Sequence, residues 1–179
     1  MDKFYFILPL ALILCFTFGC QDKEAMAELE AMKAQAAVEE QNKEIVREAL
    51  ALIDKGSLDK FNELLSEDFS LTAPGMSEPW DANMLLQAIK EFYSAFPDNK
   101  HVIEDIVAEG DITVVKLYLE GTHEKDYMGI PATGKKVTAP AIFWITITDG
   151  RIKNWWNVED SLGMMQQLGL ELKPREGKK

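Results

Sequence analysis

The chain carries two hydrophobic periods in succession, a helical one first and then an alternating one. Apolar residues recur at helical spacing over 42–53, and Gly56 stands where a helix commonly ends. Ser57 precedes a second helical stretch at 58–65, and Asp81 precedes a third that runs to Pro97. Three helices are therefore predicted, with Ser57 and Asp81 as N-terminal caps.

After the third helix the apolar period becomes two. Long strands are predicted at 101–109, 112–120, 137–148 and 151–158, with a short strand at 68–73 and a last helix at 160–168. Helices followed by a run of strands predict an α+β fold. We expect a cone-shaped α+β barrel, in which a curved antiparallel sheet packs on three N-terminal helices.

The last predicted hairpin contains the segment NWWNVED, in which two adjacent tryptophans face opposite ways. A three-residue turn at 148–150 places Phe143 opposite Trp155 and Ala141 opposite Asn157, all on one face. The other face carries Trp144 and Trp156. Because both faces carry apolar residues, alternation alone leaves open which of them lines a pocket.

The N-terminal segment predicts export and a lipid anchor. Residues 4–19 are uninterruptedly apolar, which is short for a membrane-spanning helix of about 20 residues and typical of a secretory signal, here residues 1–19. The following Cys20 completes a sequence that resembles a bacterial lipobox and is the predicted lipidation site. The alternative is an uncleaved membrane anchor.

This prediction sets the organisation and location of the protein. Residues 20–41 are rich in Ala, Glu and Lys, without Gly or Pro, and predict a helical spacer behind the lipidated cysteine. The domain then occupies residues 42–172, and 173–179 form a disordered tail. We expect secretion across the inner membrane and anchoring at the cell envelope. Gln21, in place of a retention Asp, favours the outer membrane facing the periplasm.

Composition excludes several classes of function. A chain of 179 residues with 47% hydrophobic and 27% charged residues fits one globular domain plus extensions. The net charge of −11 argues against nucleic acid as a partner. The two cysteines, Cys15 and Cys20, leave one sulfur after signal cleavage, so no disulfide or cysteine metal site is expected. We find no metal-ligand cluster and no Gly-rich phosphate loop, and expect neither a metal nor a cofactor.

Several segments together resemble the SnoaL-like polyketide cyclases and ester cyclases, members of the nuclear-transport-factor-two-like superfamily. The similar pieces are NKEIVREAL, KGSLDKFNELLSEDF, AFPD, AEGDITVVKLYLEGTHEKDYMGIPATGKKV and ITDGRIKNWWNVEDSLGMMQQLG. The resemblance implies that Phe143, Trp155 and Asn157 line the pocket. It also implies an intramolecular aldol closure that uses an Asp of a Glu-His-Trp-Asp motif and an inward His. Here Asn157 and Phe143 occupy those two positions, and an amide does not titrate near neutral pH.

Three other polar residues are candidates for acid or base. His123 matches a histidine of the family, with a loop-ordering hydrogen bond as its alternative role. Asp160 is either an acid or the cap of the last helix. Glu159 shares the inward parity of Asn157, so burial could raise its pKa. His101 is predicted to be a solvated residue at the start of a strand.

Three functions remain open from the sequence. The favoured one is a non-catalytic binding module, in which Phe143, Trp155, Asn157 and Ala141 hold a small apolar or aromatic carbonyl compound. The alternative is a cyclase or isomerase that uses Glu159, Asp160 or His123. A third is a homodimeric interaction module that pairs through the outer tryptophan face.

Overall fold

The computed structural model describes the backbone of residues 8–171 and the side chains of residues 23–171. Residues 1–7, the tail at 173–179, and the side chains of Cys20 and of the whole predicted signal segment lie outside this description. Contacts divide the chain into two units, residues 1–38 and 39–179. In the part of the chain that is described, no helix is long and apolar enough to cross a membrane.

The first helix, α1 (Leu8–Asp54), joins the predicted spacer and the first predicted helix of the domain into one element. The predicted boundary at residue 42 is not a break, because no Gly or Pro occurs between Cys20 and Gly56. In the first unit, side chains 23–38 are exposed. In the second unit, α1 buries an apolar stripe of Val46, Ala49, Leu50 and Ile53.

Two further helices precede most of the sheet, and only one of their predicted caps is correct. In α3 (Ala82–Ala95), the Asp81 carboxylate accepts a hydrogen bond from the Met84 backbone N–H at 2.9 Å, which confirms the predicted cap. In α2 (Leu58–Glu63), the Ser57 side chain makes no capping hydrogen bond. Its backbone carbonyl instead accepts from the Phe61 N–H, so the predicted side-chain cap is wrong.

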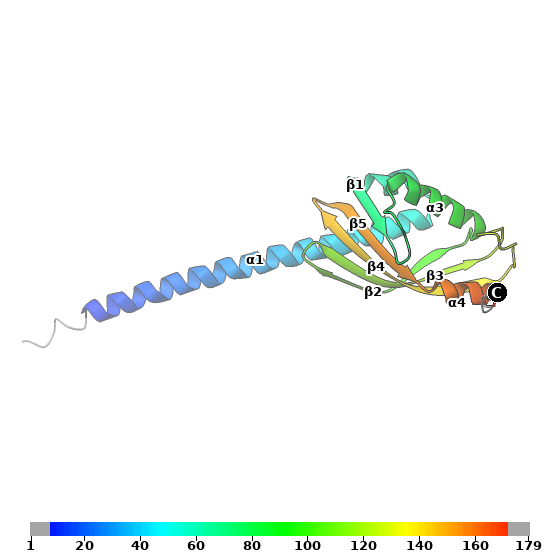
Figure 1. Ribbon diagram of the computed structural model, residues 1–179. Helices are drawn as coiled ribbons and strands as arrows, with labels where there is room; N and C mark the ends of the chain where they lie inside the picture. Colours follow the sequence, from blue (N-terminus) through cyan, green and yellow to red (C-terminus); the bar gives the residue numbers. More distant parts are fainter. Residues whose placement is uncertain (1–7, 172–179) are drawn as a thin grey trace, which may run out of the picture. The chain divides into compact units, whose positions relative to one another are not determined.

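The sheet has five strands in the order β1-β5-β4-β3-β2. The strands are β1 (Leu65–Thr72), β2 (Lys100–Glu109), β3 (Ile112–Thr122), β4 (Lys136–Thr148) and β5 (Arg151–Glu159). Four of them form an antiparallel meander, but β1 pairs parallel with β5, so the sheet is mixed rather than wholly antiparallel as predicted. The parallel pair arises because the chain leaves β1 through α3 and enters the opposite edge of the sheet at β2, as Figure 1 shows.

The last hairpin has a different register from the predicted one. Asp149 and Gly150, with φ of 52° and 73°, form a two-residue turn of the kind that matches strand twist, and a bulge follows in β5. Trp155 therefore lies opposite Ile145, and Asn157 lies opposite Phe143. Beyond the bulge the register differs by two residues, so Phe143, Trp155 and Asn157 stay on their predicted face. Next to the turn, Ile152 rather than Arg151 lies opposite Ile147.

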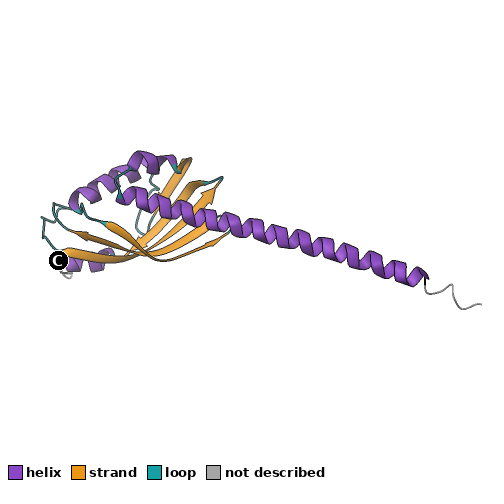
Figure 2. Ribbon diagram, turned by 180° about the vertical axis from the view of Figure 1, so that it is seen from behind, coloured by secondary structure: helices purple, strands orange, loops and turns teal. Residues whose placement is uncertain are grey.

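The concave face of the sheet carries the core. Burial alternates along all of β4, and its buried residues pack with the apolar stripe of α1 and with α3. Figure 2 shows the helices on this side of the curved sheet. A second buried cluster involves the last helix, α4 (Ser161–Leu168). Met164 and Leu168 of α4 belong to it, together with Phe96 and Val137. Because α1 and α3 cover only part of the concave face, a cavity remains between them and the sheet.

Candidate functional site

The cavity between α3 and the concave face of the sheet is an aromatic-lined pocket of about 340 Å³. Its surface is mostly apolar, and six aromatic residues contribute to it: Trp80, Phe92, Tyr93, Tyr127, Phe143 and Trp155. Phe143 and Trp155 contact each other with ring centroids 5.2 Å apart. A volume near 300 Å³ and an apolar lining with few polar groups are typical of small-molecule sites.

Two polar side chains of β5 enter the pocket from the sheet. Asn157 and Glu159 both line it, as their predicted parity requires. Within residues 23–171, the Asn157 amide makes no side-chain hydrogen bond and is available to a ligand. Burial raises the pKa of the Glu159 carboxyl, and a hydrogen bond from Ser161 opposes that rise. Burial also raises the pKa of Tyr127, and the negative charge of Glu159 adds to the effect.

A histidine and an aspartate form the polar end of the pocket. The His101 Nδ1 lies 2.6 Å from Asp54 Oδ1, and the His101 backbone N–H donates to the same carboxylate at 3.1 Å. Its side chain is only 8% exposed, and the ring lies 6.1 Å from that of Phe143. His101 is therefore a pocket residue and not the solvated strand start that was predicted. It points inward because it has the same parity as Ile103 on β2.

The same carboxylate organises two further pocket residues. The Tyr93 hydroxyl donates to Asp54 at 2.8 Å and accepts from the Asn99 amide at 3.1 Å. Gly121 on β3 lets the strand approach Asn99 closely, since a Cβ at that position would lie 3.3 Å from the Asn99 Cα. Asn99 itself is buried. The network is therefore fixed by contacts from α1, α3, β2 and β3.

The hydrogen bonds keep Asp54 ionised. Burial alone would raise its pKa, but hydrogen bonds from His101 and from the Tyr93 hydroxyl outweigh burial and lower the pKa of Asp54. Conversely, burial and the neighbouring Asp54 raise the pKa of Tyr93. At neutral pH the structure thus holds a carboxylate that accepts from one imidazole, one phenol and one backbone N–H.

His123 lies outside the residues that line the pocket. The residue is fully buried, and its ring stacks on Phe96 with centroids 5.0 Å apart. Its Nδ1 lies 3.2 Å from the Thr133 hydroxyl, and its backbone bonds with Lys135 and Gly134 close the loop. This is the loop-ordering arrangement that the sequence left open as its alternative role.

Asp160 and Ala141 also lie outside the pocket lining. The Asp160 carboxylate accepts from the Gly163 N–H at 2.8 Å and caps α4. Gly163 makes room for this carboxylate, because a Cβ there would overlap it. Ala141 is buried in the core opposite Glu159 and is not among the residues that line the pocket, so its part in ligand binding stays a prediction.

The outer face of the sheet carries exposed apolar residues. Trp144 and Trp156 are directly opposite each other on β4 and β5 and are 47% and 38% exposed. Ile142 and Val158 form the next outward pair. The two adjacent tryptophans of the NWWN segment thus have separate places, Trp155 in the pocket and Trp156 on the surface. Self-association through this face stays a prediction.

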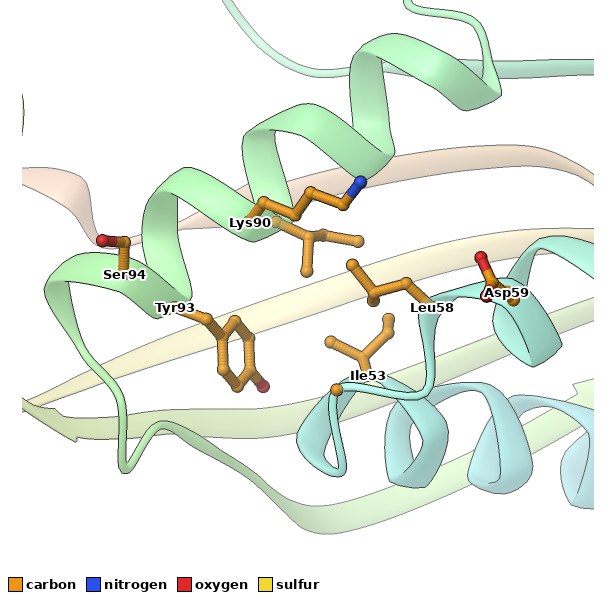
Figure 3. Close-up of a pocket in the computed structure, with 8 residues that line it drawn as sticks. Ile53, Leu58, Asp59, Lys90, Tyr93 and Ser94 are labelled. Atoms are coloured by element: carbon orange, nitrogen blue, oxygen red, sulfur yellow. The ribbon is translucent and has the colours of Figure 1, made fainter.

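A second hollow lies on the outside of the helical layer, between the end of α1, α2 and α3 (Figure 3). It is larger, about 560 Å³, and includes Leu58, Asp59, Lys90 and Ser94. Polar and apolar groups contribute to it almost equally, and Tyr93 is its one aromatic residue among those described. The inner pocket differs from this hollow in having the mostly apolar lining with few polar groups that small-molecule sites share.

The fold and the pocket define a class of protein: a cone-shaped α+β domain with an aromatic pocket on the concave face of its sheet. A model of the SnoaL-like polyketide cyclase family matches residues 43–168, and the chain belongs to this family. The resemblance stated from the sequence is thereby confirmed.

Two kinds of relative agree with this assignment. The chain is 38% identical over 77 residues to aklanonic acid methyl ester cyclase DnrD of Streptomyces peucetius, a match that covers 42% of this chain and 52% of that one. It therefore spans about half the length of the curated relatives it matches. IdmH of Streptomyces antibioticus, described as a proposed polyketide cyclase, is similar in structure with 27% identity and a TM-score of 0.68, over 73% of this chain and 99% of that chain.

Proposed function

We propose that the pocket binds a small, largely apolar carbonyl compound, with an aromatic or cyclic body held by Phe143 and Trp155. The observation that carries the proposal is the free amide of Asn157 in an otherwise aromatic pocket. An amide N–H that donates to a carbonyl oxygen orients a ligand without changing charge. Membership of a family of polyketide cyclases supports a carbonyl compound as the ligand class.

The proposal is tested by comparing the binding of two compounds. One is 2-tetralone, a bicyclic ketone, and the other is tetralin, the same ring system without the carbonyl. Trp80 and Trp155 line the pocket, so their fluorescence reports occupancy. We expect saturable binding of the ketone. Asn157→Leu removes the amide at similar volume and should weaken ketone binding about 3- to 10-fold, the value of one hydrogen bond, while tetralin binding stays unchanged.

The matched control is Asn154→Leu, which alters an exposed asparagine on the same strand. It should bind 2-tetralone like the unaltered protein. Absence of saturable ketone binding would contradict the proposed function. Equal weakening of ketone and tetralin by Asn157→Leu would contradict the role of the amide.

The proposal places this pocket at the cell envelope, held there by a lipid on Cys20. The support is the apolar segment at 4–19 and the Gly19-Cys20 pair that follows it. Cys20→Ser is expected to move the protein from the membrane fraction to the soluble fraction of its own host and to abolish incorporation of a labelled fatty acid. Unchanged membrane association and labelling in the variant would contradict the anchor.

A further inference from the structure

We infer that the His101–Asp54 pair makes this pocket a proton-transfer site, in which His101 Nε2 is the general base for a carbon acid next to the ligand carbonyl. The inference rests on the proposed function, because it requires a carbonyl compound in the pocket. It assigns a catalytic role to His101 and a positioning role to Asp54, and the sequence predicted neither role. It also supplies a titratable group in a pocket where Asn157 and Phe143 occupy the family's acid and base positions.

The first argument is the orientation of the imidazole. Nδ1 and the backbone N–H of His101 both bind the carboxylate of Asp54, so the ring is held by two bonds to one residue. A carboxylate accepts only, so Nδ1 carries the hydrogen and Nε2 carries the lone pair. The carboxylate therefore selects the tautomer in which the outer nitrogen is a base.

The second argument is the position of Nε2. His101 lines the pocket together with Phe143 and Asn157. In the described part of the chain, Nε2 of His101 has no hydrogen-bond partner. The atom is also not fully enclosed, because it is absent from the buried side-chain atoms that lack a partner. Nε2 of His123, by contrast, is fully enclosed in the core, whereas Nε2 of His101 is not enclosed and belongs to a residue that lines the cavity.

The third argument is the support behind the carboxylate. Tyr93 donates to the same Oδ1 that faces the imidazole, and Asn99 donates to Tyr93 in turn. Asp54 is thus fixed by hydrogen bonds that include neither Nε2 of His101 nor a ligand. A carboxylate held in this way stabilises an imidazolium that forms during reaction without itself accepting the proton. Asp54 is a positioning residue, and His101 is the catalytic residue.

The reaction that this arrangement supports is enolisation. Nε2 takes a proton from the carbon next to the carbonyl, the C–H electron pair becomes the enolate π bond, and the oxygen takes the negative charge beside the Asn157 amide. The imidazolium exchanges this proton with solvent and returns a solvent-derived proton to the same carbon, which is hydrogen exchange. Alternatively, the imidazolium returns its proton to another carbon of a conjugated enolate, which isomerises the ligand. No further reactant is needed. The substrate class is a cyclic or aryl ketone with an activated C–H.

Hydrogen exchange of 2-tetralone in D₂O tests the inference, because its C1–H lies between the carbonyl and the aromatic ring. NMR would follow the loss of this proton signal with full-length protein and with buffer alone. We expect the protein to accelerate exchange. His101→Gln should lower the accelerated rate about 100-fold or more, the usual share of a general base, with 2-tetralone affinity changed by less than about 3-fold.

Two variants separate a chemical role from a structural one. His123→Gln removes the second histidine of the chain, which lies outside the pocket lining. This variant should keep the accelerated exchange. Asp54→Asn should lower the turnover rate more than it changes KM, since the amide keeps the shape but not the charge. In ¹⁵N-labelled unaltered protein, His101 should show a protonated Nδ1 and a bare Nε2, and Asp54→Asn should mix the two tautomers.

The outcomes distinguish the inference from the function on which it rests. Binding of 2-tetralone without accelerated exchange overturns the inference and leaves the proposed function intact. Absence of binding overturns both. Full exchange activity in a folded His101→Gln variant places the base elsewhere. If that variant does not fold, the ¹⁵N spectrum of the unaltered protein is the test. A neutral His101 that carries its proton on Nε2 would contradict the assignment of this nitrogen as the base.

Discussion

Trp155→Ala is expected to lower the free energy of unfolding by about 3–5 kcal/mol, the range for loss of a large buried aromatic side chain. Trp155 is 5% exposed. Its ring packs edge-on against Phe61, with ring centroids 6.3 Å apart, and at a tilt against Phe143, with centroids 5.2 Å apart. The cavity left behind would join the existing pocket, so 2-tetralone affinity should fall at least about 10-fold as well. Denaturant unfolding followed by circular dichroism measures the first effect.

The matched control is the adjacent tryptophan. Trp156 has the same side chain on the same strand but points outward, so Trp156→Ala should cost about 1 kcal/mol and leave ligand binding unchanged. A loss below about 1 kcal/mol for Trp155→Ala would contradict the core position of this residue. Equal losses for the two variants would contradict the opposite facing of the pair.

Asp54→Ala is expected to lower the free energy of unfolding by about 3 kcal/mol at pH 7, because bonds to a charged acceptor are worth more than neutral ones. The carboxylate accepts from His101 and Tyr93, and the substitution leaves these donors without a partner in the interior. Urea unfolding of the two proteins at a series of pH values measures the difference. Glu48→Ala, an exposed acid on the same helix, is the control and should change stability by less than about 0.5 kcal/mol.

The pH dependence of this difference has a definite sign. The pKa of Asp54 is lower in the folded protein than in the unfolded chain, where an Asp titrates near about 4. Its contribution is therefore fully present above that unfolded value and is lost as the pH falls through the lower folded value. The gap between unaltered protein and Asp54→Ala should narrow as the pH falls below about 4. A gap that widens below about pH 4 would contradict the ionised state of Asp54.

The sequence predicts the strands, and which residues share a face, because both follow from local alternation; the family resemblance indicates which of the two faces lines the pocket. Phe143, Trp155, Asn157 and Glu159 are on the expected face although the register of the hairpin differs. The turn was expected to have three residues, whereas Asp149 takes a positive φ that an acidic residue tolerates. Since the register differs by an even number of residues, the error has no consequence for the site.

The acid–base pair could not be predicted in the same way. His101 and Asp54 are 47 residues apart, on a strand and at the end of a helix, and no spacing rule connects them. Only one local signal was available: His101 shares its parity with the inward Ile103. The packing of α1 over the sheet, which sets the partner of His101, depends on tertiary contacts that alternation does not encode.

The central claim is that the aromatic pocket of the concave face, with Asn157 and His101 in it, is the ligand site. Intermolecular NOEs between 2-tetralone and the isotope-labelled protein test this claim most directly. We predict contacts from the ligand ring to the indole protons of Trp155 and the ring of Phe143, and from its C1 protons to His101. Contacts confined to Trp144 and Trp156 on the outer face of the sheet, or to Leu58 in the second hollow between α1, α2 and α3, would contradict it.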